Sequence, residues 1–439
     1  MSSGPEGAEV AVVGLGYVGL TLAVALAGAG VRTLGYDRVP EAVERIAACE
    51  PWCEEPGVRE ALRDLPASAL ALTAALPQRL PPFVVVCVGT PIDRETRAPD
   101  LSQLRRALEE IGPRLDPEAV VVVRSTVPVG TTEGFVHERL ARFIERPRLA
   151  FCPERTIQGK ALRELAELPQ VVGSDDRDVA RAAAGLFARL GTETVGVSSA
   201  AAAEMVKLAC NAHTDVLYGF GNEVALMAHG LGLDAGEVIA AANEGYPRPD
   251  IAPPGYVGGS CLVKDPYLLS HSVAMANREP LLVAAARQLN ESVPRHVAER
   301  VMALLGAAAE PAAGEGTVLV AGFAYKGSPV TDDVRGNAAG PLIECLRGSV
   351  RELRGHDFVV PAERIEPFGV APVELAAGFR GAHAAVLLND HPAYRGEDAR
   401  ALVASMRPPR IVYDLWGLWR DARLGLNGSG CTYLRLGHD

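Results

Sequence analysis

The stretch "VVGLGYVGL", residues 12–20, decides the fold of the first part of this chain. Gly14, Gly16 and Gly19 have the spacing GxGxxG, directly after an apolar run and at the start of a helical stretch. In this pattern the first glycine allows a tight turn, the second lets backbone approach a pyrophosphate, and the third lets helix and strand pack closely. A second apolar run ends at Asp37, at the spacing of the carboxylate that binds an adenosine ribose. The stretch predicts a dinucleotide-binding βαβ unit.

The residues around this motif also indicate which dinucleotide is bound. An acidic side chain at Asp37 favours NAD over NADP because it repels a 2′-phosphate, although Arg38 beside it acts in the opposite sense. Tyr17 and Val18 begin the helix and are expected to contact the cofactor together with the glycines. A glycine-rich turn without a ligand is the alternative, and it leaves Asp37 unexplained.

Length, charge and cysteine content limit the remaining possibilities. The chain has 439 residues, enough for two or three domains. Its net charge of -11 argues against a nucleic-acid or anionic-membrane binder, which needs a basic surface. The eight cysteines form no CxxC pair and no metal-like spacing, so we expect no metal site, free thiols and a cytoplasmic protein.

The order of apolar and amphipathic runs predicts the domains. Runs such as "VVVCVG", "AVVVVRS" and "PQVVG" alternate with amphipathic stretches over residues 1–198, as in a doubly wound parallel sheet. Residues 199–306 contain no strand run and are predicted to be helical, including one long helix. Residues 307–439 return to the α/β pattern. We therefore predict an α/β fold with two Rossmann-like parallel-sheet domains joined by a central helical region.

Several polar residues follow the predicted strands. Thr90 in "CVGTP", Ser125 and Thr126 in "RSTVPVG", and Glu154 in "CPERTIQGK" come after three apolar runs. Each alone is typical of an ordinary loop. Because parallel strands end at one edge of their sheet, we expect the four side chains beside the cofactor.

A second group of candidates lies in the central region. Lys207 and Asn211 are four residues apart on the long helix and so share one face, where they could stabilise an alkoxide. In "GGSCLVKDP", Gly258 and Gly259 would let backbone approach a substrate before Cys261. A solvated lysine and a structural cysteine are the commoner readings of these features. Beside a dinucleotide site, however, a thiol fits an enzyme that oxidises an aldehyde through a thioester.

At this point the chain resembles a known family, the UDP-glucose/GDP-mannose dehydrogenases, which oxidise C6 of a nucleotide sugar. The resemblance rests on "GLGYVGL", "GTP", "STVPVG", "CPER", "AEMVKLACN", "GGSCLVKD" and "GFAYKGSPVTDDVRG", in this order. It implies an NAD domain, a central helical dimerisation region, a C-terminal nucleotide-sugar domain and hence a homodimer. It also implies a four-electron oxidation that uses two NAD molecules in turn.

The resemblance implies roles for individual residues. Cys261 matches the nucleophile, whereas Lys207, Asn211 and Asp265 match the groups that hold the C6 oxygen and the catalytic water. Thr126 and Glu154 match the proton-relay and water-positioning residues. The implied contacts to the sugar nucleotide are Glu154, Arg155, Lys207, Asn211, Arg248, Tyr256, Gly258, Gly259 and Lys326, and Arg335 is implied to contact the cofactor.

The motifs leave the substrate open. "CPER" resembles the branch that acts on UDP-N-acetylhexosamines, whereas "GGSC" followed by Lys264 is more similar to UDP-glucose enzymes. We favour a UDP-N-acetylhexosamine, with UDP-glucose next and GDP-mannose after it. A two-electron dehydrogenase of the hydroxyacid type also uses a Lys/Asn pair, but it needs neither Cys261 nor a second α/β domain. A binding or regulatory protein would not need the complete catalytic set.

Overall fold

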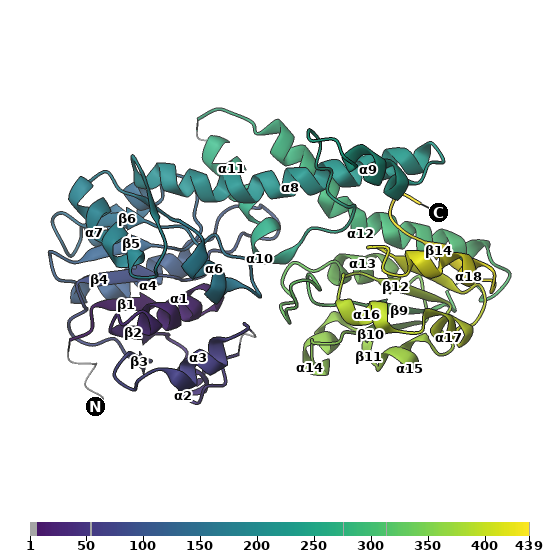
Figure 1. Cartoon of the computed structure of the whole chain (residues 1–439), viewed down its shortest axis with the longest axis horizontal. Helices are drawn as coiled ribbons and strands as arrows, with labels where there is room; N and C mark the ends of the chain where they lie inside the picture. Colours follow the sequence, from purple (N-terminus) through teal and green to yellow (C-terminus); the bar gives the residue numbers. More distant parts are fainter. Residues whose placement is uncertain (1–6, 53–54, 275, 313, 439) are drawn as a thin grey trace. The chain divides into compact units, whose positions relative to one another are not determined.

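The computed structural model describes residues 7–52, 55–274, 276–312 and 314–438. The chain forms two compact units (Figure 1). The first comprises Met1–Asn211 and Tyr267–Pro280, and the second comprises Ala212–Pro266 and Leu281–Asp439. Within the described residues, no helix is both long enough and apolar enough to cross a membrane.

The first unit is built on an eight-stranded sheet with the order β3-β2-β1-β4-β5-β6-β7-β8. The central strands consist of valine and other apolar residues that are all buried except the half-buried Phe83, because helices cover both faces of the sheet. The strands are β1 (Val10–Val13), β2 (Thr33–Tyr36), β3 (Leu70–Thr73), β4 (Phe83–Val86), β5 (Val120–Val123), β6 (Arg148–Phe151), β7 (Gln170–Gly173) and β8 (Thr194–Val197). The helices are α1 (Tyr17–Gly28), α2 (Pro40–Ala47), α3 (Val58–Asp64), α4 (Ser102–Ile111), α5 (His137–Leu140), α6 (Ala161–Glu167) and α7 (Arg177–Ala188).

The strand order places a ligand crevice in this sheet. The chain proceeds outward from β1 through β2 to β3, then returns to the other side of β1 with β4, so the order reverses between β1 and β4. Ligands of open α/β sheets bind at such a point, outside the carboxyl ends of the strands. The predicted doubly wound sheet is confirmed. One pairing differs from the rest, because Phe151 of β6 lies opposite Gly173 of an antiparallel β7.

Helices dominate the middle of the chain, as predicted. The longest is α8 (Ala200–Gly230), and it is followed by α9 (Ala235–Asn243), α10 (Gly259–Leu262), α11 (Asp265–Ala274) and α12 (Leu281–Ala307). The boundary between the two units falls inside α8, after Asn211. The predicted three-part division at residues 198 and 306 stays a prediction.

The second unit contains a six-stranded sheet with the order β11-β10-β9-β12-β13-β14, and all its pairings are parallel. Its core is again a set of fully buried apolar strands. The strands are β9 (Thr317–Ala321), β10 (Glu352–His356), β11 (Ala371–Pro372), β12 (Ala384–Leu387), β13 (Ile411–Asp414) and β14 (Thr432–Leu434). The helices that follow α12 are α13 (Ala339–Leu346), α14 (Ala362–Ile365), α15 (Leu375–Phe379), α16 (Pro392–Gly396), α17 (Ala399–Ala404) and α18 (Arg423–Asn427).

The first turn of each sheet is closed in the same way. In the first sheet, the carboxylate of Asp37 after β2 accepts the backbone N–H groups of Leu15 at 2.8 Å and Val39 at 3.0 Å. In the second sheet, the carboxylate of Asp357 after β10 accepts the N–H of Phe323 at 2.7 Å. Each aspartate thus ties the turn after the first strand to the end of the second strand. The two α/β halves are therefore related folds in this detail as well as in strand order.

Candidate active site

The turn between β1 and α1 has the geometry that its glycines predict. Gly14 has a φ of +92°, a conformation that a residue with a side chain rarely adopts. A Cβ on Gly19 would lie 1.8 Å from the carbonyl oxygen of Gly14, so the helix can pack on the turn only with glycine there. At Gly16, by contrast, no atom lies within 4 Å of such a Cβ, which leaves open space above the backbone. The turn therefore has room for a pyrophosphate at the start of α1.

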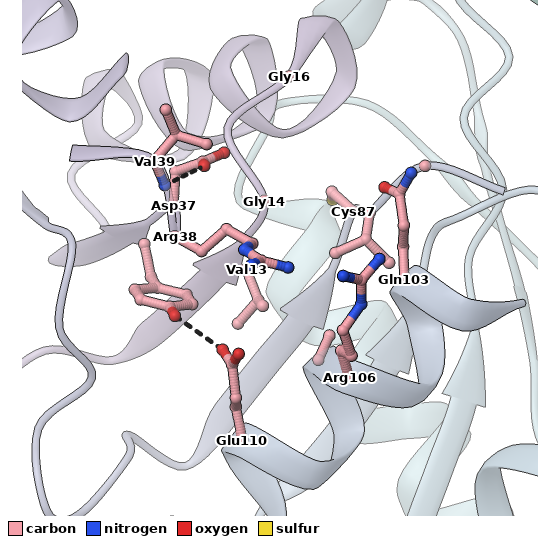
Figure 2. Close-up of a pocket in the computed structure, with 14 residues that line it drawn as sticks. Val13, Gly14, Gly16, Asp37, Arg38, Val39, Cys87, Gln103, Arg106 and Glu110 are labelled. Carbon is pink, nitrogen blue, oxygen red and sulfur yellow. Dashed lines mark hydrogen bonds between the residues drawn. The ribbon is translucent and has the colours of Figure 1, made fainter. Parts of the chain in front are cut away.

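A pocket opens beside this turn, at the reversal of strand order (Figure 2). It has a volume of about 360 Å³. It is lined by Val13, Gly14, Gly16, Tyr36, Asp37, Arg38, Val39, Cys87, Val88, Gly89, Gln103, Arg106, Ala107 and Glu110. The turn, the carboxylate of Asp37 and the apolar side chains of Val13, Cys87 and Val88 fit the adenosine and pyrophosphate parts of NAD.

Two arginines line the same pocket as Asp37. Arg38 follows β2, whereas Arg106 comes from α4, and both side chains line the pocket (Figure 2). The acidic side chain on the far wall, Glu110, accepts a hydrogen bond from the hydroxyl of Tyr36 at 2.7 Å. Burial and this carboxylate raise the pKa of Tyr36 to about 12, so the phenol stays protonated at neutral pH. Arg38 was predicted to lie at the cofactor site, whereas Arg106 was not, because the amphipathic pattern of α4 does not distinguish it from a solvated arginine.

Thr90 and Ser125 lie at the carboxyl ends of β4 and β5, as predicted. The hydroxyl of Thr90 donates to the backbone carbonyl of Thr126. The hydroxyl of Ser125 donates to the carbonyl of Val88 at 2.7 Å. These bonds join the loops that follow the two strands. The predicted contacts of these residues with the cofactor stay predictions.

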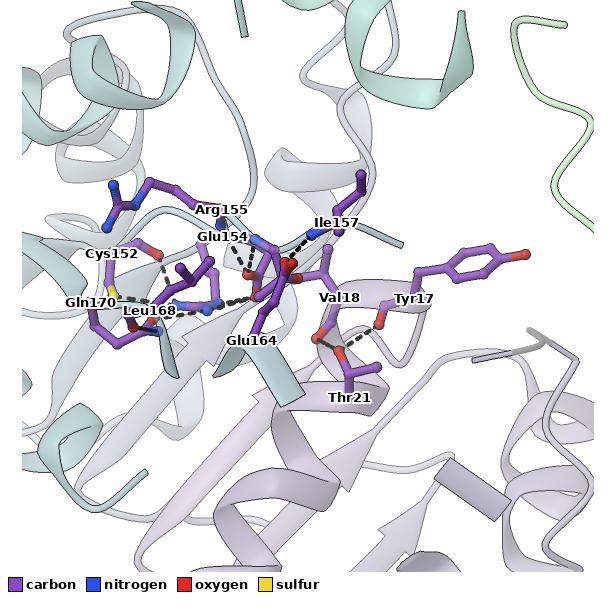
Figure 3. A network of polar contacts seen from close by, with 12 residues as sticks. Tyr17, Val18, Thr21, Cys152, Glu154, Arg155, Ile157, Glu164, Leu168 and Gln170 are labelled. Carbon is purple, nitrogen blue, oxygen red and sulfur yellow. Dashed lines mark hydrogen bonds and ion pairs between the residues drawn. The ribbon is translucent and has the colours of Figure 1, made fainter. Parts of the chain in front are cut away.

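Glu154 is at the next strand end and forms a buried ion pair with Arg124. Nη2 of Arg124 lies 2.6 Å from Oε2 of Glu154, and both side chains are almost completely buried. The same guanidinium donates to the carbonyl of Cys152 at 3.3 Å and to the side-chain oxygen of Gln170 at 3.2 Å. Figure 3 shows Cys152, Glu154 and Gln170 gathered in this network. Sequence reasoning missed Arg124, because a charge at the end of an apolar run is usually solvated.

The environment of Glu154 keeps its carboxylate ionised. Burial alone would raise its pKa, but the charge of Arg124 and the N–H of Thr156 outweigh burial and lower the pKa below its ordinary value. The charge of Lys207 acts in the same direction, so Lys207 lies within electrostatic reach of Glu154. Arg155, predicted to contact the substrate, donates its side chain to the carbonyl of Pro169.

The first half of α8 carries Lys207 and Asn211 one turn apart, as the spacing predicted. Lys207 is buried and Asn211 half-buried, so neither is the solvated surface residue of the alternative interpretation. One turn earlier, Glu204 accepts the N–H of Thr132 at 2.8 Å and its hydroxyl at 2.6 Å. It also accepts the N–H of Gly130. Glu204 therefore ties this part of α8 to the loop that follows β5.

Cys261 lies on the short helix α10 of the second unit and is exposed. Burial raises the pKa of Cys87 and Cys152 to about 12, and that of Cys431 to about 11, so these thiols stay protonated and unreactive at neutral pH. Cys210 is also exposed, but it lies in the first unit on α8. An exposed thiol in the predicted loop distinguishes Cys261 from the buried structural cysteine of the alternative interpretation.

Steric contacts explain why the residues at positions 258 and 259, before Cys261, are glycines. A Cβ on Gly258 would lie 2.0 Å from the carbonyl oxygen of Gly336, and one on Gly259 would lie 2.7 Å from the ring of Tyr325. The N–H of Gly259 also donates to that carbonyl at 3.1 Å. The loop of Cys261 is therefore packed against residues 325–336, the motif "YKGSPVTDDVRG". The sequence predicted that Gly258 and Gly259 let the backbone approach a substrate. In the described structure, these glycines let the backbone approach residues 325–336 of the protein itself.

The charged residues after Cys261 pair with each other. Nζ of Lys264 lies 2.6 Å from Oδ1 of Asp265, whose side chain is fully buried. The ammonium charge of Lys264 is therefore paired with the carboxylate of Asp265. The predicted role of Asp265 in holding water stays a prediction.

The remaining predicted residues also lie in the second unit. Arg335 makes an ion pair with Asp333 at 2.6 Å, and Nζ of Lys326 lies 5.4 Å from the ring centre of Tyr325. Arg248 is exposed beside the ring of Tyr246, whereas Tyr256 is buried in the core.

The predicted residues are thus divided between the two units. The first unit holds the cofactor pocket, Thr126, Glu154, Arg155, Lys207 and Asn211. The second holds Cys261, Asp265 and the other residues assigned to the sugar nucleotide. Among the described residues, no group of three or more His, Cys, Asp or Glu side chains has the arrangement of a metal site.

Three family models match successive parts of the chain, all from the UDP-glucose/GDP-mannose dehydrogenase family. The NAD binding domain matches residues 8–191, the central domain residues 201–292, and the UDP binding domain residues 319–421. The chain is 33% identical over 417 residues to a UDP-N-acetyl-D-mannosamine dehydrogenase of Pyrococcus horikoshii, covering 92% of this chain and 94% of that protein.

Two further comparisons extend this likeness. The chain is 31% identical to an NDP-N-acetyl-D-galactosaminuronic acid dehydrogenase of Ralstonia nicotianae, over 94% of this chain and 97% of the relative. The solved structure of a UDP-D-ManNAc dehydrogenase from Pyrococcus horikoshii matches with a TM-score of 0.88 and 31% identity, covering 98% of this chain and 99% of that one. Similarity therefore extends over nearly the whole chain in both sequence and fold.

Proposed function

The chain belongs to the UDP-glucose/GDP-mannose dehydrogenase family, and we propose that it oxidises the C6 hydroxyl of a UDP-N-acetylhexosamine to a carboxylate. Both relatives described above are named for N-acetylated amino sugars or their uronic acids. The motif "CPER" favours the same substrate class. NAD is the cofactor, in agreement with the pocket beside Asp37.

The first oxidation converts the C6 alcohol to an aldehyde. Lys207 and Asn211, on one face of α8, stabilise the oxygen as it loses its proton to a water held by Asp265. Bound NAD supplies the hydride acceptor for this oxidation and for the next. Glu154 is kept anionic by Arg124, so its charge can attract the ammonium of Lys207, but its lowered pKa makes it a poor general acid.

The second oxidation uses the thiol of Cys261. The thiolate adds to the aldehyde carbon, and the new C–S bond makes a thiohemiacetal. Loss of a hydride then gives a thioester, and water cleaves the C–S bond to release the carboxylate and return the thiol. In sum, one alcohol, one water and two NAD⁺ give one carboxylate, two NADH and three protons. The covalent intermediate keeps the aldehyde from escaping.

The observation that carries this proposal is an exposed Cys261, packed on the "YKGSPVTDDVRG" motif, in a chain that also has an NAD pocket. A two-electron hydroxyacid dehydrogenase needs no such thiol. Measuring NADH formed per sugar consumed separates the two reactions. Two equivalents with a uronate product support the proposal, whereas one equivalent with a released aldehyde would overturn it.

The sugar is identified by a substrate panel. NADH formation is compared for UDP-GlcNAc, UDP-ManNAc, UDP-GalNAc, UDP-glucose and GDP-mannose at equal concentrations. We expect the highest kcat/KM with one of the N-acetylated UDP-sugars. UDP-glucose is the second candidate because "GGSC" followed by Lys264 is similar to enzymes that oxidise it. A higher kcat/KM for UDP-glucose than for all three N-acetylated sugars would replace the first assignment with the second.

We also propose that the protein is a homodimer through α8 and α9. Three apolar side chains of the second half of α8 are exposed, namely Leu217, Phe220 and Met227, and so is Leu231 directly after the helix, with 41 to 75% of their surface accessible. The spacings of three and seven residues place the three helical side chains on one face of α8. Val238 of α9 is exposed as well. An apolar stripe of this kind is costly in water, and a second copy that presents the same stripe would cover it.

Light scattering tests the dimer. The wild-type chain is expected to have twice the monomer mass at micromolar concentration, and the double variant Phe220→Lys/Met227→Lys the monomer mass. The matched control is Val195→Lys, a similarly exposed apolar residue on the edge strand β8 of the first unit, which should not change the mass. A monomeric wild type would refute the assignment.

We propose a cytoplasmic location as well. The cysteines described by the structure are all free thiols, as is usual in a reducing compartment, and two of them are exposed. Fractionation of the source cells tests this location, which predicts that the chain is recovered with cytoplasmic markers.

A further inference from the structure

The segment that carries Cys261 lies on a buried arginine. Arg287 of α12 is 1% exposed, and its Nη1 donates to the carbonyl of Leu262 at 2.8 Å. Its Nη2 donates to the carbonyl of Val257 at 3.2 Å. One guanidinium thus binds the backbone on both sides of Cys261, one residue after it and four residues before it. A planar, rigid fork of donors is suited to fixing two acceptors relative to each other.

Arg287 is held in turn by Asp215 of α8. Nη1 of Arg287 donates to Oδ1 of Asp215 at 2.8 Å, and Nδ2 of Asn290 donates to the same oxygen at 2.9 Å. The side chain of Asp215 is fully buried. A buried ion pair is weak evidence for stability, since apolar residues of the same volume often stabilise a core as well or better. Stability alone therefore does not explain the Arg287–Asp215 pair. Because the pair binds the segment that carries Cys261, positioning of that segment is the better explanation.

A second clamp fixes the start of the segment. Asn222 of α8 donates from Nδ2 to the carbonyl of Gly255 at 2.9 Å and accepts the N–H of Gly255 at 2.8 Å. The same Nδ2 donates to Oδ1 of Asn290 at 2.8 Å. Both backbone groups of Gly255 are therefore bound by one side chain, which joins the clamp to the Arg287–Asp215 pair through Asn290.

We propose that Arg287, Asp215, Asn222 and Asn290 are positioning residues that set the backbone of residues 255–262 and so the place of the Cys261 thiol. They act through that backbone and do not touch the substrate. The consequence for catalysis rests on the proposed role of Cys261 as nucleophile. Formation of a C–S bond needs the sulfur within about 3–3.5 Å of the carbon, and an error of 1 Å can cost about 10²-fold in rate. The four side chains would therefore affect the second oxidation more than the first.

Two variants with matched controls separate positioning from general stability. Arg287→Lys keeps the charge but loses the fork, and Arg435→Lys makes the same change in the Arg435–Asp234 pair, which joins the C-terminal turn to α9. Asn222→Ala removes the clamp on Gly255. Asn243→Ala removes a clamp of the same form on Ile251, where Asn243 donates to the carbonyl and accepts the N–H, each at 3.0 Å.

The first readout does not depend on enzyme activity. The full-length variants are treated with iodoacetamide over a range of pH, and mass spectrometry follows alkylation of Cys261 and of Cys210, which serves as a reference in the same molecule. We expect Arg287→Lys and Asn222→Ala to change the rate at Cys261 at least threefold or to shift its pH profile, with no change at Cys210. The two control variants should leave the ratio of the rates unchanged.

The second readout is the product ratio, with semicarbazide present to trap aldehyde. We expect Arg287→Lys to yield fewer than two NADH per sugar together with trapped aldehyde, and its kcat for uronate to fall about 10²-fold with the KM values for both substrates unchanged. A purely structural lesion would lower both oxidations together and leave the ratio at two. If Arg287→Lys does not fold, Asn222→Ala decides the question by the same measurements.

The outcomes distinguish this inference from the proposed function. Unchanged alkylation of Cys261 and an unchanged product ratio in Asn222→Ala and in folded Arg287→Lys would overturn the inference and leave the function intact. A wild type that makes one NADH per sugar would overturn the function, yet altered alkylation of Cys261 in the variants alone would still show that these residues position the thiol.

Discussion

Arg124 donates two hydrogen bonds, at 2.6 and 3.1 Å, to the same carboxylate oxygen of Glu154 in a site almost closed to solvent. The other oxygen accepts the N–H groups of Arg155 and Thr156, each at 2.9 Å. This carboxylate is therefore occupied by the protein on both oxygens. Its effect on a reaction would be exerted through charge and through the loop whose shape it fixes.

We expect Glu154→Gln to lower the free energy of unfolding of the first unit by about 3–5 kcal/mol at neutral pH, because it leaves Arg124 as an uncompensated buried charge. The pKa of Glu154 is lowered on folding, so this stabilisation is present above the ordinary pKa of a glutamate and is lost as the pH falls through the lowered value. Urea unfolding at two pH values measures both effects. The matched control is Glu167→Gln, which breaks the exposed Arg163–Glu167 pair and should change nothing measurable.

Glu204 should give the opposite pH dependence. Burial raises its pKa to about 7, although the bonds from Thr132 and Gly130 oppose the shift. The folded state then binds a proton more tightly than the unfolded state, so stability declines between about pH 4.5 and 7, by about 3 kcal/mol in total. Relative to Glu204→Gln, which cannot titrate, the wild type should lose stability between pH 5 and pH 8 in urea unfolding. A constant difference between the two proteins would contradict the raised pKa.

Asp37 is expected to exclude NADP although Arg38 and Arg106 line the same pocket. In Asp37→Ser the carboxylate is gone and both guanidinium groups remain, so kcat/KM for NAD should fall about 10- to 100-fold while that for NADP rises. Initial rates with each dinucleotide measure the change. Adding Arg38→Gln and Arg106→Gln to Asp37→Ser should abolish the gain with NADP, and a gain that persists would show that the arginines do not bind the 2′-phosphate.

Cys261→Ser should bind nucleotide sugar normally and stop after the first oxidation. A serine hydroxyl is a far weaker nucleophile than a thiolate at neutral pH, so we expect one NADH per sugar and no uronate. Calorimetric binding and product analysis provide the two measurements. Cys210→Ser, which removes the other exposed thiol among the described cysteines, should retain two NADH per sugar. Uronate formation by Cys261→Ser at the wild-type rate would remove Cys261 from the mechanism.

Gly258→Ala should displace the loop of Cys261, because the new Cβ would lie 2.0 Å from the carbonyl oxygen of Gly336. We expect uronate formation to fall at least about 10²-fold, with the affinity of the first unit for NAD unchanged. In Gly185→Ala of α7, no atom lies within 4 Å of the new Cβ, so that variant should keep full activity and gain about 0.5–1 kcal/mol of stability. Full activity in Gly258→Ala would show that the backbone contact does not position the loop.

The parts that the sequence predicted well are those set by local pattern. The turn from Gly14 to Gly19, the strand that ends at Asp37 and the long helix through Lys207 each depend on neighbours along the chain. Strands β3 and β8 were missed for a physical reason. Every residue of β3 is only half-buried and the middle of β8 is exposed, so neither has the continuous apolar run of a strand covered on both faces.

The supporting residues could not be predicted, because their partners are distant in sequence. In the sequence, Arg124 is only a charged residue at the end of a predicted strand. The fold alone brings it to Glu154 and Gln170. Arg287 lies on an amphipathic helix among other arginines, and nothing nearby shows that it binds the carbonyl of Val257. In both cases a charged side chain on an otherwise ordinary element is buried by long-range packing.

The contact between Gly258 and Gly336 also predicts how mutations at these two positions affect each other. The carbonyl oxygen of Gly336 occupies the place where residue 258 would carry a side chain, and a Cβ on Gly336 would lie 2.8 Å from the carbonyl oxygen of Gly259, so the two codons control one close contact between two loops. Mutational effects at these positions should therefore be strongly epistatic. In a library randomised at both codons and selected for growth that depends on the uronate, glycine should be recovered at both together, and a lone substitution should survive only with a second change that moves one of the two loops.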